Sequence, residues 1–122
     1  MNTYKDLIVW QKSMVLCTNI YKVTKLFPKD ELYGIISQMR RSSVAIPSNI
    51  AEGYRRGHRL EYLQFLRISY GSASELETQL IVSLNIKYLT ELQYKELNNL
   101  LEEVLKMLNK LISSLYPKPY TL

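Results

Sequence analysis

Five of the six arginines of this 122-residue chain lie between residues 40 and 59, and they are the residues best suited to binding a ligand. They are Arg40, Arg41, Arg55, Arg56 and Arg59. A guanidinium group donates two parallel hydrogen bonds to a phosphate, and several such groups bind a polyanion without reading its sequence. The sequence therefore predicts a polyanion-binding surface. The alternative is that some of these arginines pair with Glu52, Glu61 or Glu75.

Polar side chains surround Pro47 in the same segment: Ser43, Ser48, Asn49 and Glu52. A proline inside a helix removes one backbone hydrogen bond, and nearby polar groups can satisfy the carbonyl that it frees. We therefore assign this cluster a structural role. Asn49 also suits a hydrogen bond between helices, because buried polar groups almost always find partners.

The carboxylates Glu75 and Glu77 are not a catalytic pair, because near neighbours on a helix point in different directions. Glu77 falls on the predicted inner stripe, so we expect it to form a buried ion pair with Arg40 or Arg41. The one histidine, His58, occupies the position that caps the N-terminus of the following helix. We predict no catalytic residue.

Composition places the chain among ordinary globular proteins, with 47% apolar and 22% charged residues and few glycines and prolines. Residues 1–60 carry a net charge of +6 and residues 61–122 a net charge of −1, so the basic character lies in the first half. One cysteine and one histidine leave no usual zinc cluster, and no cofactor motif is present. No apolar run approaches the length of a membrane span. We predict one cytoplasmic domain over residues 1–122, without metal, cofactor or membrane contact.

Two helices are expected in the first half of the chain. In the first, apolar residues at 3-4-3-4 spacing define one face: Leu7, Trp10, Met14, Cys17 and Tyr21. The second runs from about Asp30 to Arg56 and contains Pro47, so we expect a kinked helix, with a complete break as the alternative. If this helix were continuous, one stripe would hold Arg41, Ser48, Glu52, Arg55 and Arg59.

Two further helices are expected in the second half. Gly57 suits the position after a helix C-terminus, and a third helix follows from about Arg59 to Ile86. Its small residues around Gly71 predict another backbone passing close by. The fourth helix begins after Thr90, which forms a capping box with Gln93. Residues 117–122 are expected to form a short flexible tail. Because the connections are short, the helices should form an antiparallel up-down-up-down bundle.

The predicted helices carry more apolar residues than the core of one bundle requires. In the fourth helix, the surplus is Leu100, Leu105, Met107 and Ile112. In the first and third helices, it is Val9, Val15, Ile20, Val23, Ile68 and Val82. Either the core stripe is wide and some apolar residues are exposed, or a second face is buried against other copies of the chain. We favour the second interpretation, a homo-oligomer.

The run Gln38-Met-Arg-Arg-Ser-Ser-Val-Ala-Ile-Pro-Ser-Asn-Ile-Ala-Glu-Gly53 closely resembles the signature of a bacterial protein family. Its members are typically encoded in intervening sequences of some 23S ribosomal RNA genes. Further matching motifs are Asp6-Leu-x-Val-Trp-Gln-Lys12, Phe27-Pro-Lys29, Glu61-Tyr-Leu-x-Phe-Leu66, Gly71-Ser-x-x-Glu-Leu-Glu77 and Tyr88-Leu89. The chain departs from the usual pattern at His58 and Tyr62.

The resemblance implies an up-down four-helix bundle that assembles as a ring-like homopentamer. The family has no established enzymatic activity. It is similar to the accessory protein of diversity-generating retroelements, which implies a basic barrel that binds nucleic acid; in that relative, binding occurs alongside a reverse transcriptase.

Our leading hypothesis is therefore a non-enzymatic homo-oligomer that binds structured RNA, or an RNA–protein complex, through its arginine-rich surface. The alternative is a scaffold that binds another protein and has no nucleic-acid ligand. A nuclease-like enzyme is least favoured, because the sequence offers no base–nucleophile pair.

Overall fold

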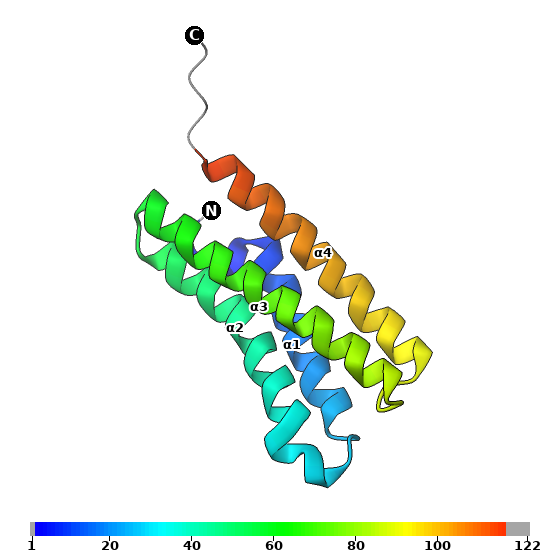
Figure 1. Cartoon of the computed structure of the whole chain (residues 1–122). Coiled ribbons are helices and arrows are strands. Elements are labelled where there is room, and N and C mark those ends of the chain that lie inside the picture. Colours follow the sequence, from blue (N-terminus) through cyan, green and yellow to red (C-terminus); the bar gives the residue numbers. More distant parts are fainter. Residues whose placement is uncertain (1, 117–122) are drawn as a thin grey trace.

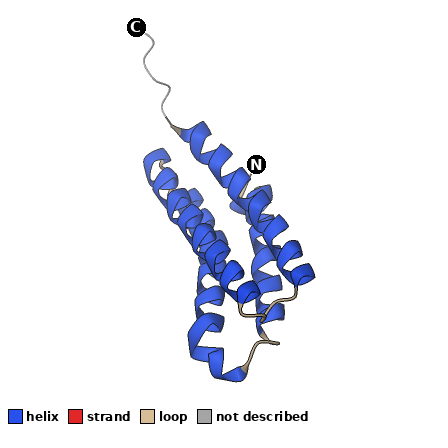
Figure 2. Cartoon of the chain, turned by 45° about the vertical axis from the view of Figure 1, so that its right-hand side comes forward, coloured by secondary structure: helices blue, strands red, loops and turns tan. Residues whose placement is uncertain are grey.

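The described residues, 2–116 of a computed structural model, fold into an antiparallel bundle of four helices and include no strand (Figure 1). The helices are α1 (Ile8–Thr24), α2 (Ser37–Arg55), α3 (Arg59–Asn85) and α4 (Glu91–Leu115). Residues 56–58 and 86–90 form short connections, whereas residues 25–36, between α1 and α2, form a longer one (Figure 2). The all-α, up-down-up-down fold is thus confirmed. The predicted tail, residues 117–122, lies outside the described residues.

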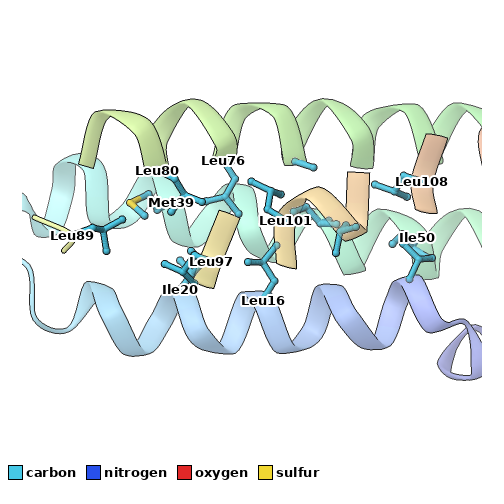
Figure 3. Packing of buried hydrophobic residues seen from close by; sticks show 14 of the residues in the cluster. Leu16, Ile20, Met39, Ile50, Leu76, Leu80, Leu89, Leu97, Leu101 and Leu108 are labelled. Carbon is cyan, nitrogen blue, oxygen red and sulfur yellow. The ribbon is translucent and has the colours of Figure 1, made fainter. Parts of the chain in front are cut away.

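The core runs along the centre of the bundle, because each helix packs on its sequence neighbours and α1 closes against α4. Fully buried side chains come from every helix, among them Leu16, Met39, Leu76 and Leu101 (Figure 3). Burying one such side chain stabilises the fold by about 1.5–3 kcal/mol, before the entropy of ordering it is subtracted. These layers of aliphatic side chains hold the four helices in register.

Helix α4 follows its predicted pattern closely. Thr90 and Gln93 form the reciprocal capping box, with the Gln93 amide donating to Thr90 Oγ1 at 3.1 Å. The heptad residues Leu97, Leu101, Val104 and Leu108 are buried, and the last two, Leu111 and Leu115, are half-buried. The surplus residues of this helix are half-buried against the same core: Leu100, Leu105, Met107 and Ile112. In α4, therefore, the wide core stripe accounts for the surplus.

Helix α1 presents a different face to the core from the one predicted. Its buried residues are Val9, Ser13, Leu16, Ile20 and Thr24. Of the predicted face, Leu7 and Trp10 are half-buried against the core, whereas Met14 and Tyr21 are exposed. Two apolar stripes lie side by side on this helix, and periodicity alone does not decide between them. Packing against α2 and α4 selects the stripe that contains the branched aliphatic residues.

Helix α2 runs through Pro47 without interruption, so the alternative of a complete break is wrong. The distortion lies earlier, where a 3-10 turn, η2 (Lys29–Glu31), leads into a five-residue π-helix, η3 (Leu32–Ile36). Within it, Gly34 has non-helical dihedral angles (φ −107°, ψ −120°). The α-helical part of the second segment therefore begins at Ser37, later than predicted.

The close approach of two backbones occurs at Gly53 and not at Gly71, as the sequence had indicated. A Cβ atom built on Gly53 would lie 2.7 Å from Phe65 Cβ and 3.3 Å from the carbonyl oxygen of Tyr62. The same test at Gly71 meets nothing within 4 Å. Gly53 thus lets α2 and α3 converge just below the turn that joins them. No helix among the described residues is long and apolar enough to cross a membrane.

Candidate nucleic-acid interface

The five candidate arginines occupy two separate places in the fold. Arg40 and Arg41, the groove arginines, lie in the second turn of α2. Arg55, Arg56 and Arg59, the turn arginines, lie where α2 ends and α3 begins. A helix rises 1.5 Å per residue, so about 21 Å of helix separates Arg41 from Arg55. The single stripe that would have included Arg59 does not form, because α2 ends at Arg55.

The turn arginines are brought together by a tight reversal. Gly57 has a φ of +68°, a left-handed conformation that closes the C-terminus of α2. His58 occupies the N-cap position of α3 with extended dihedral angles, but its side chain makes no capping hydrogen bond there. The three arginine side chains are exposed. The guanidinium of Arg55 lies 5.3 Å from the centre of the Tyr4 ring, and that of Arg56 lies 5.0 Å from the Phe65 ring.

One of the turn arginines is paired with an acidic residue. Arg56 Nη2 donates to Glu52 Oε2 at 2.8 Å, one helical turn earlier. This hydrogen bond, together with the negative charges of Glu52 and Glu61, raises the pKa of Arg56 above its ordinary value despite some desolvation. Arg55 and Arg59 form no salt bridge with any residue from 2 to 116. The predicted alternative of internal pairing therefore holds for Arg56 but not for these two.

The groove arginines differ from each other. Arg40 is half-buried, and its Nε donates to Thr24 Oγ1 at 3.0 Å. Its guanidinium lies 4.7 Å from the centre of the Tyr21 ring, within cation–π range. Arg41 is exposed and borders two grooves, one between α1 and α2 and one between α2 and α3.

The predicted ion pair of Glu77 with Arg40 or Arg41 is wrong. Arg41 lines the α2–α3 groove with Glu75 and Gln79 of α3. Residue 77 lies two positions from each of these residues, which is a turn of about 200° around the helix, so its side chain points away from the groove that Arg41 lines. Glu77 is half-buried and forms no salt bridge within the described chain.

The polar cluster near Pro47 is divided between the helix interior and its surface. Ser43 Oγ donates to the carbonyl oxygen of Arg40 at 3.0 Å, and Asn49 Nδ2 donates to that of Ala45 at 2.8 Å. Both hydrogen bonds stay within α2. Ser48 and Glu52 are exposed. Ser43 Oγ also lies 3.5 Å from Cys17 Sγ of α1, and on the other side Ser69 Oγ of α3 donates to the carbonyl oxygen of Ile46 at 2.9 Å.

Three residues of the groove region carry no signal in the sequence. Tyr21 and Thr24 end α1 and position Arg40, but their spacing is that of any helical pair. Tyr33 is 92% exposed on the π-helix. The one sequence feature that could have drawn attention to Tyr33 is its neighbour Gly34, since a glycine interrupts regular helix geometry.

Comparison with known proteins agrees with the signature in α2. The 23S rRNA-intervening sequence protein family matches residues 5–110. A crystal structure of a protein of unknown function from the S23 ribosomal protein family of Bacteroides thetaiotaomicron is similar to this chain. Its TM-score is 0.81 and its sequence identity 27%, over 87% of this chain and 96% of the other. No curated protein matches this one.

Proposed function

The chain belongs to the 23S rRNA-intervening sequence protein family, and from this premise we propose that it is a non-enzymatic, homo-oligomeric protein that binds structured RNA. The observation that carries the proposal is the exposure of the turn arginines, two of which have no acidic partner among residues 2–116. Such guanidinium groups are free to bind phosphates bidentately.

Binding would depend on repetition of the same small surface. Three arginines per chain, partly offset by Glu52 and Glu61, give only modest attraction for a polyanion. An oligomer presents this surface several times, and each further contact then forms at a high effective concentration. Affinity would come from the release of counterions and would fall steeply with salt.

Exposed apolar side chains support assembly of several chains, which the resemblance implies as a pentamer. Part of the predicted surplus lies at the surface: Val15 on α1, with Ile68 and Val82 on α3. Contact with another copy would remove these side chains from water.

A binding role fits the described side chains better than catalysis does. His58 is exposed at the start of α3, and Glu75 and Glu77 point to different sides of that helix. A general base needs a partner group in hydrogen-bond reach, and no such pair forms among these residues.

The alternative is a scaffold that binds another protein. It is favoured by large exposed apolar residues away from the arginines, such as Leu26 and Leu92. A scaffold would retain its partner at salt concentrations that release RNA.

The experiment is fluorescence anisotropy of a labelled, structured RNA with the wild type and the variant Arg55→Glu/Arg56→Glu/Arg59→Glu. A matched control, Lys29→Glu/Lys95→Glu/Lys106→Glu, makes the same change in net charge at exposed sites elsewhere. We expect micromolar or tighter binding at low salt, at least a hundredfold weaker in the arginine variant and little changed in the control. Absence of binding by the wild type at low salt would exclude the RNA proposal and leave the scaffold.

A further inference from the structure

A groove runs along α2 and is bordered by η3 and by Tyr21 of α1. We name it the Arg40 groove; its volume is about 800 Å³, within the range of small-molecule sites. Apolar side chains line part of it, including Leu32, Ile36 and Val44. Arg40 and Arg41 line it as well. An apolar surface beside two cations suits a ligand with a flat apolar part and an anionic part.

Arg40 is held in place before any ligand arrives. Its Nε donates to Thr24 Oγ1, and the Thr24 hydroxyl is itself fixed, because it donates to the carbonyl oxygen of Ile20 at 2.7 Å. Thr24 is only 1% exposed, so this anchor is rigid. The guanidinium also lies against the Tyr21 ring. A preorganised guanidinium loses little conformational freedom when it binds a phosphate.

The outer edge of the Arg40 guanidinium is available for such a bond. Its Nη1 and Nη2 groups carry four donors, and neither nitrogen has a hydrogen-bond partner among residues 2–116. Arg41 follows directly in sequence, is exposed, and forms no salt bridge within the same residues. Consecutive residues point about 100° apart on a helix, so the shared lining of the groove, and not adjacency in sequence, lets both cations meet one phosphate.

The one acidic residue that lines the groove does not neutralise this pair. Glu52 lies at the opposite end of the lining from Tyr33, about three turns after Arg41 on α2. Its carboxylate accepts the hydrogen bond of Arg56 at 2.8 Å. The groove therefore keeps a net positive charge near Arg40 and Arg41.

Tyr33 supplies an aromatic surface in the same groove as the two arginines. It lines the groove, and its side chain is 92% exposed on the π-helix η3. An aromatic ring left this far in water has a large apolar area still to bury. Stacking of a nucleobase on such a ring strengthens binding of single strands by about tenfold, with little preference among bases.

We propose that the Arg40 groove binds one unpaired nucleotide of an RNA chain, with its phosphate on Arg40 and Arg41 and its base stacked on Tyr33. A paired base is already stacked in its helix, so the site selects loops, bulges and ends. This inference rests on the proposed function and refines it. The turn arginines bind the backbone of folded RNA, and the Arg40 groove binds one unpaired nucleotide of the same RNA.

The test uses the full chain and a six-nucleotide single-stranded RNA that carries one 2-aminopurine, whose fluorescence is quenched by stacking. Binding is followed by anisotropy, and stacking by the quench. The variants are Tyr33→Ala, its conservative counterpart Tyr33→Phe, and Arg41→Glu. Tyr70→Ala, an exposed tyrosine on α3, is the matched control. Tyr33 and Arg41 are exposed, so none of their substitutions threatens folding.

We expect the wild type to quench the probe. Tyr33→Ala should bind it about tenfold more weakly without quenching, Tyr33→Phe and Tyr70→Ala should behave as wild type, and Arg41→Glu should bind at least tenfold more weakly. Equal quenching by Tyr33→Ala and wild type would overturn the inference. So would equal RNA affinities of Tyr33→Ala and wild type together with displacement of the RNA by inorganic phosphate, because the site would then bind an anion without a base.

Failure of this inference is distinguishable from failure of the proposed function. If structured RNA binds through the turn arginines while the hexamer shows no effect of Tyr33→Ala, only the groove is excluded. If neither RNA binds at low salt, both are excluded.

Discussion

The turn arginines and the groove arginines are drawn from one sequence cluster, yet the fold gives them different surroundings. The turn arginines project from a helix reversal closed by Gly57; Arg55 and Arg56 lie near half-buried aromatic rings, and Arg56 also pairs with Glu52. Arg40 is instead anchored through its Nε to a buried hydroxyl of the neighbouring helix. An exposed set of charges suits many phosphates weakly, whereas an anchored guanidinium suits one phosphate in one geometry.

The largest effect is expected from Gly53→Ala, which disturbs the turn region and leaves the Arg40 groove intact. The new Cβ would lie 2.7 Å from Phe65 Cβ, so α2 and α3 must separate. We expect the free energy of unfolding to fall by about 3 kcal/mol, as overpacking does. Chemical denaturation measures this. A variant as stable as wild type would show that the two helices separate at no cost.

A pair of charge reversals separates the two groove arginines. Arg40→Glu removes the hydrogen bond to Thr24 and the contact with the Tyr21 ring, so we expect a loss of about 2 kcal/mol in stability. Arg41→Glu, at an exposed site, should change stability by less than about 0.5 kcal/mol. Thermal melts of the two variants give the comparison. A destabilised Arg41→Glu variant would favour the scaffold, in which that arginine is an internal partner.

The pH dependence of stability probes the packing below the turn arginines. Burial, and to a lesser degree Tyr54, raises the pKa of Tyr62 to about 12. In the unfolded chain this phenol ionises near pH 10, so between pH 10 and about 12 the folded state holds more protons and stability falls as pH rises. Tyr62→Phe should lack this part of the decline. Parallel denaturation curves at pH 8 and pH 11.5 measure it, and identical declines in the two proteins would contradict the prediction.

The smallest effect is expected from Glu52→Gln, which releases Arg56 from its partner. The pair is exposed, so the melting temperature should change by less than about 2 °C. Affinity for structured RNA should rise about two- to threefold, because one more guanidinium is free and one negative charge is gone. Anisotropy at low salt detects this change. A weaker affinity would mean that Glu52 positions Arg56 for binding.

Sequence reasoning succeeds where one pattern excludes the others. Helix α4 has a strict heptad and a capping box, and both appear as predicted. In α1, two apolar stripes compete, and the choice depends on packing with α2 and α4, which one sequence does not reveal.

For the candidate interface too, the sequence predicted some features and not others. Clustering between residues 40 and 59 correctly marks the arginines as a group in sequence, but a straight helix carries Arg41 and Arg55 about 21 Å apart. The partners of Arg40 come from α1. These residues are far from Arg40 in sequence, so their contacts with it could not be predicted before the packing of α1 on α2 was known.

The salt dependence of structured-RNA binding, measured with wild type and the turn-arginine variant, tests the central claim most directly. The account predicts a steep fall in log affinity with log salt for the wild type, with a slope of several. The slope should be smaller by about two to three in a variant that is still folded. Equal slopes for the two proteins would contradict it, because the turn arginines would then contact no phosphate.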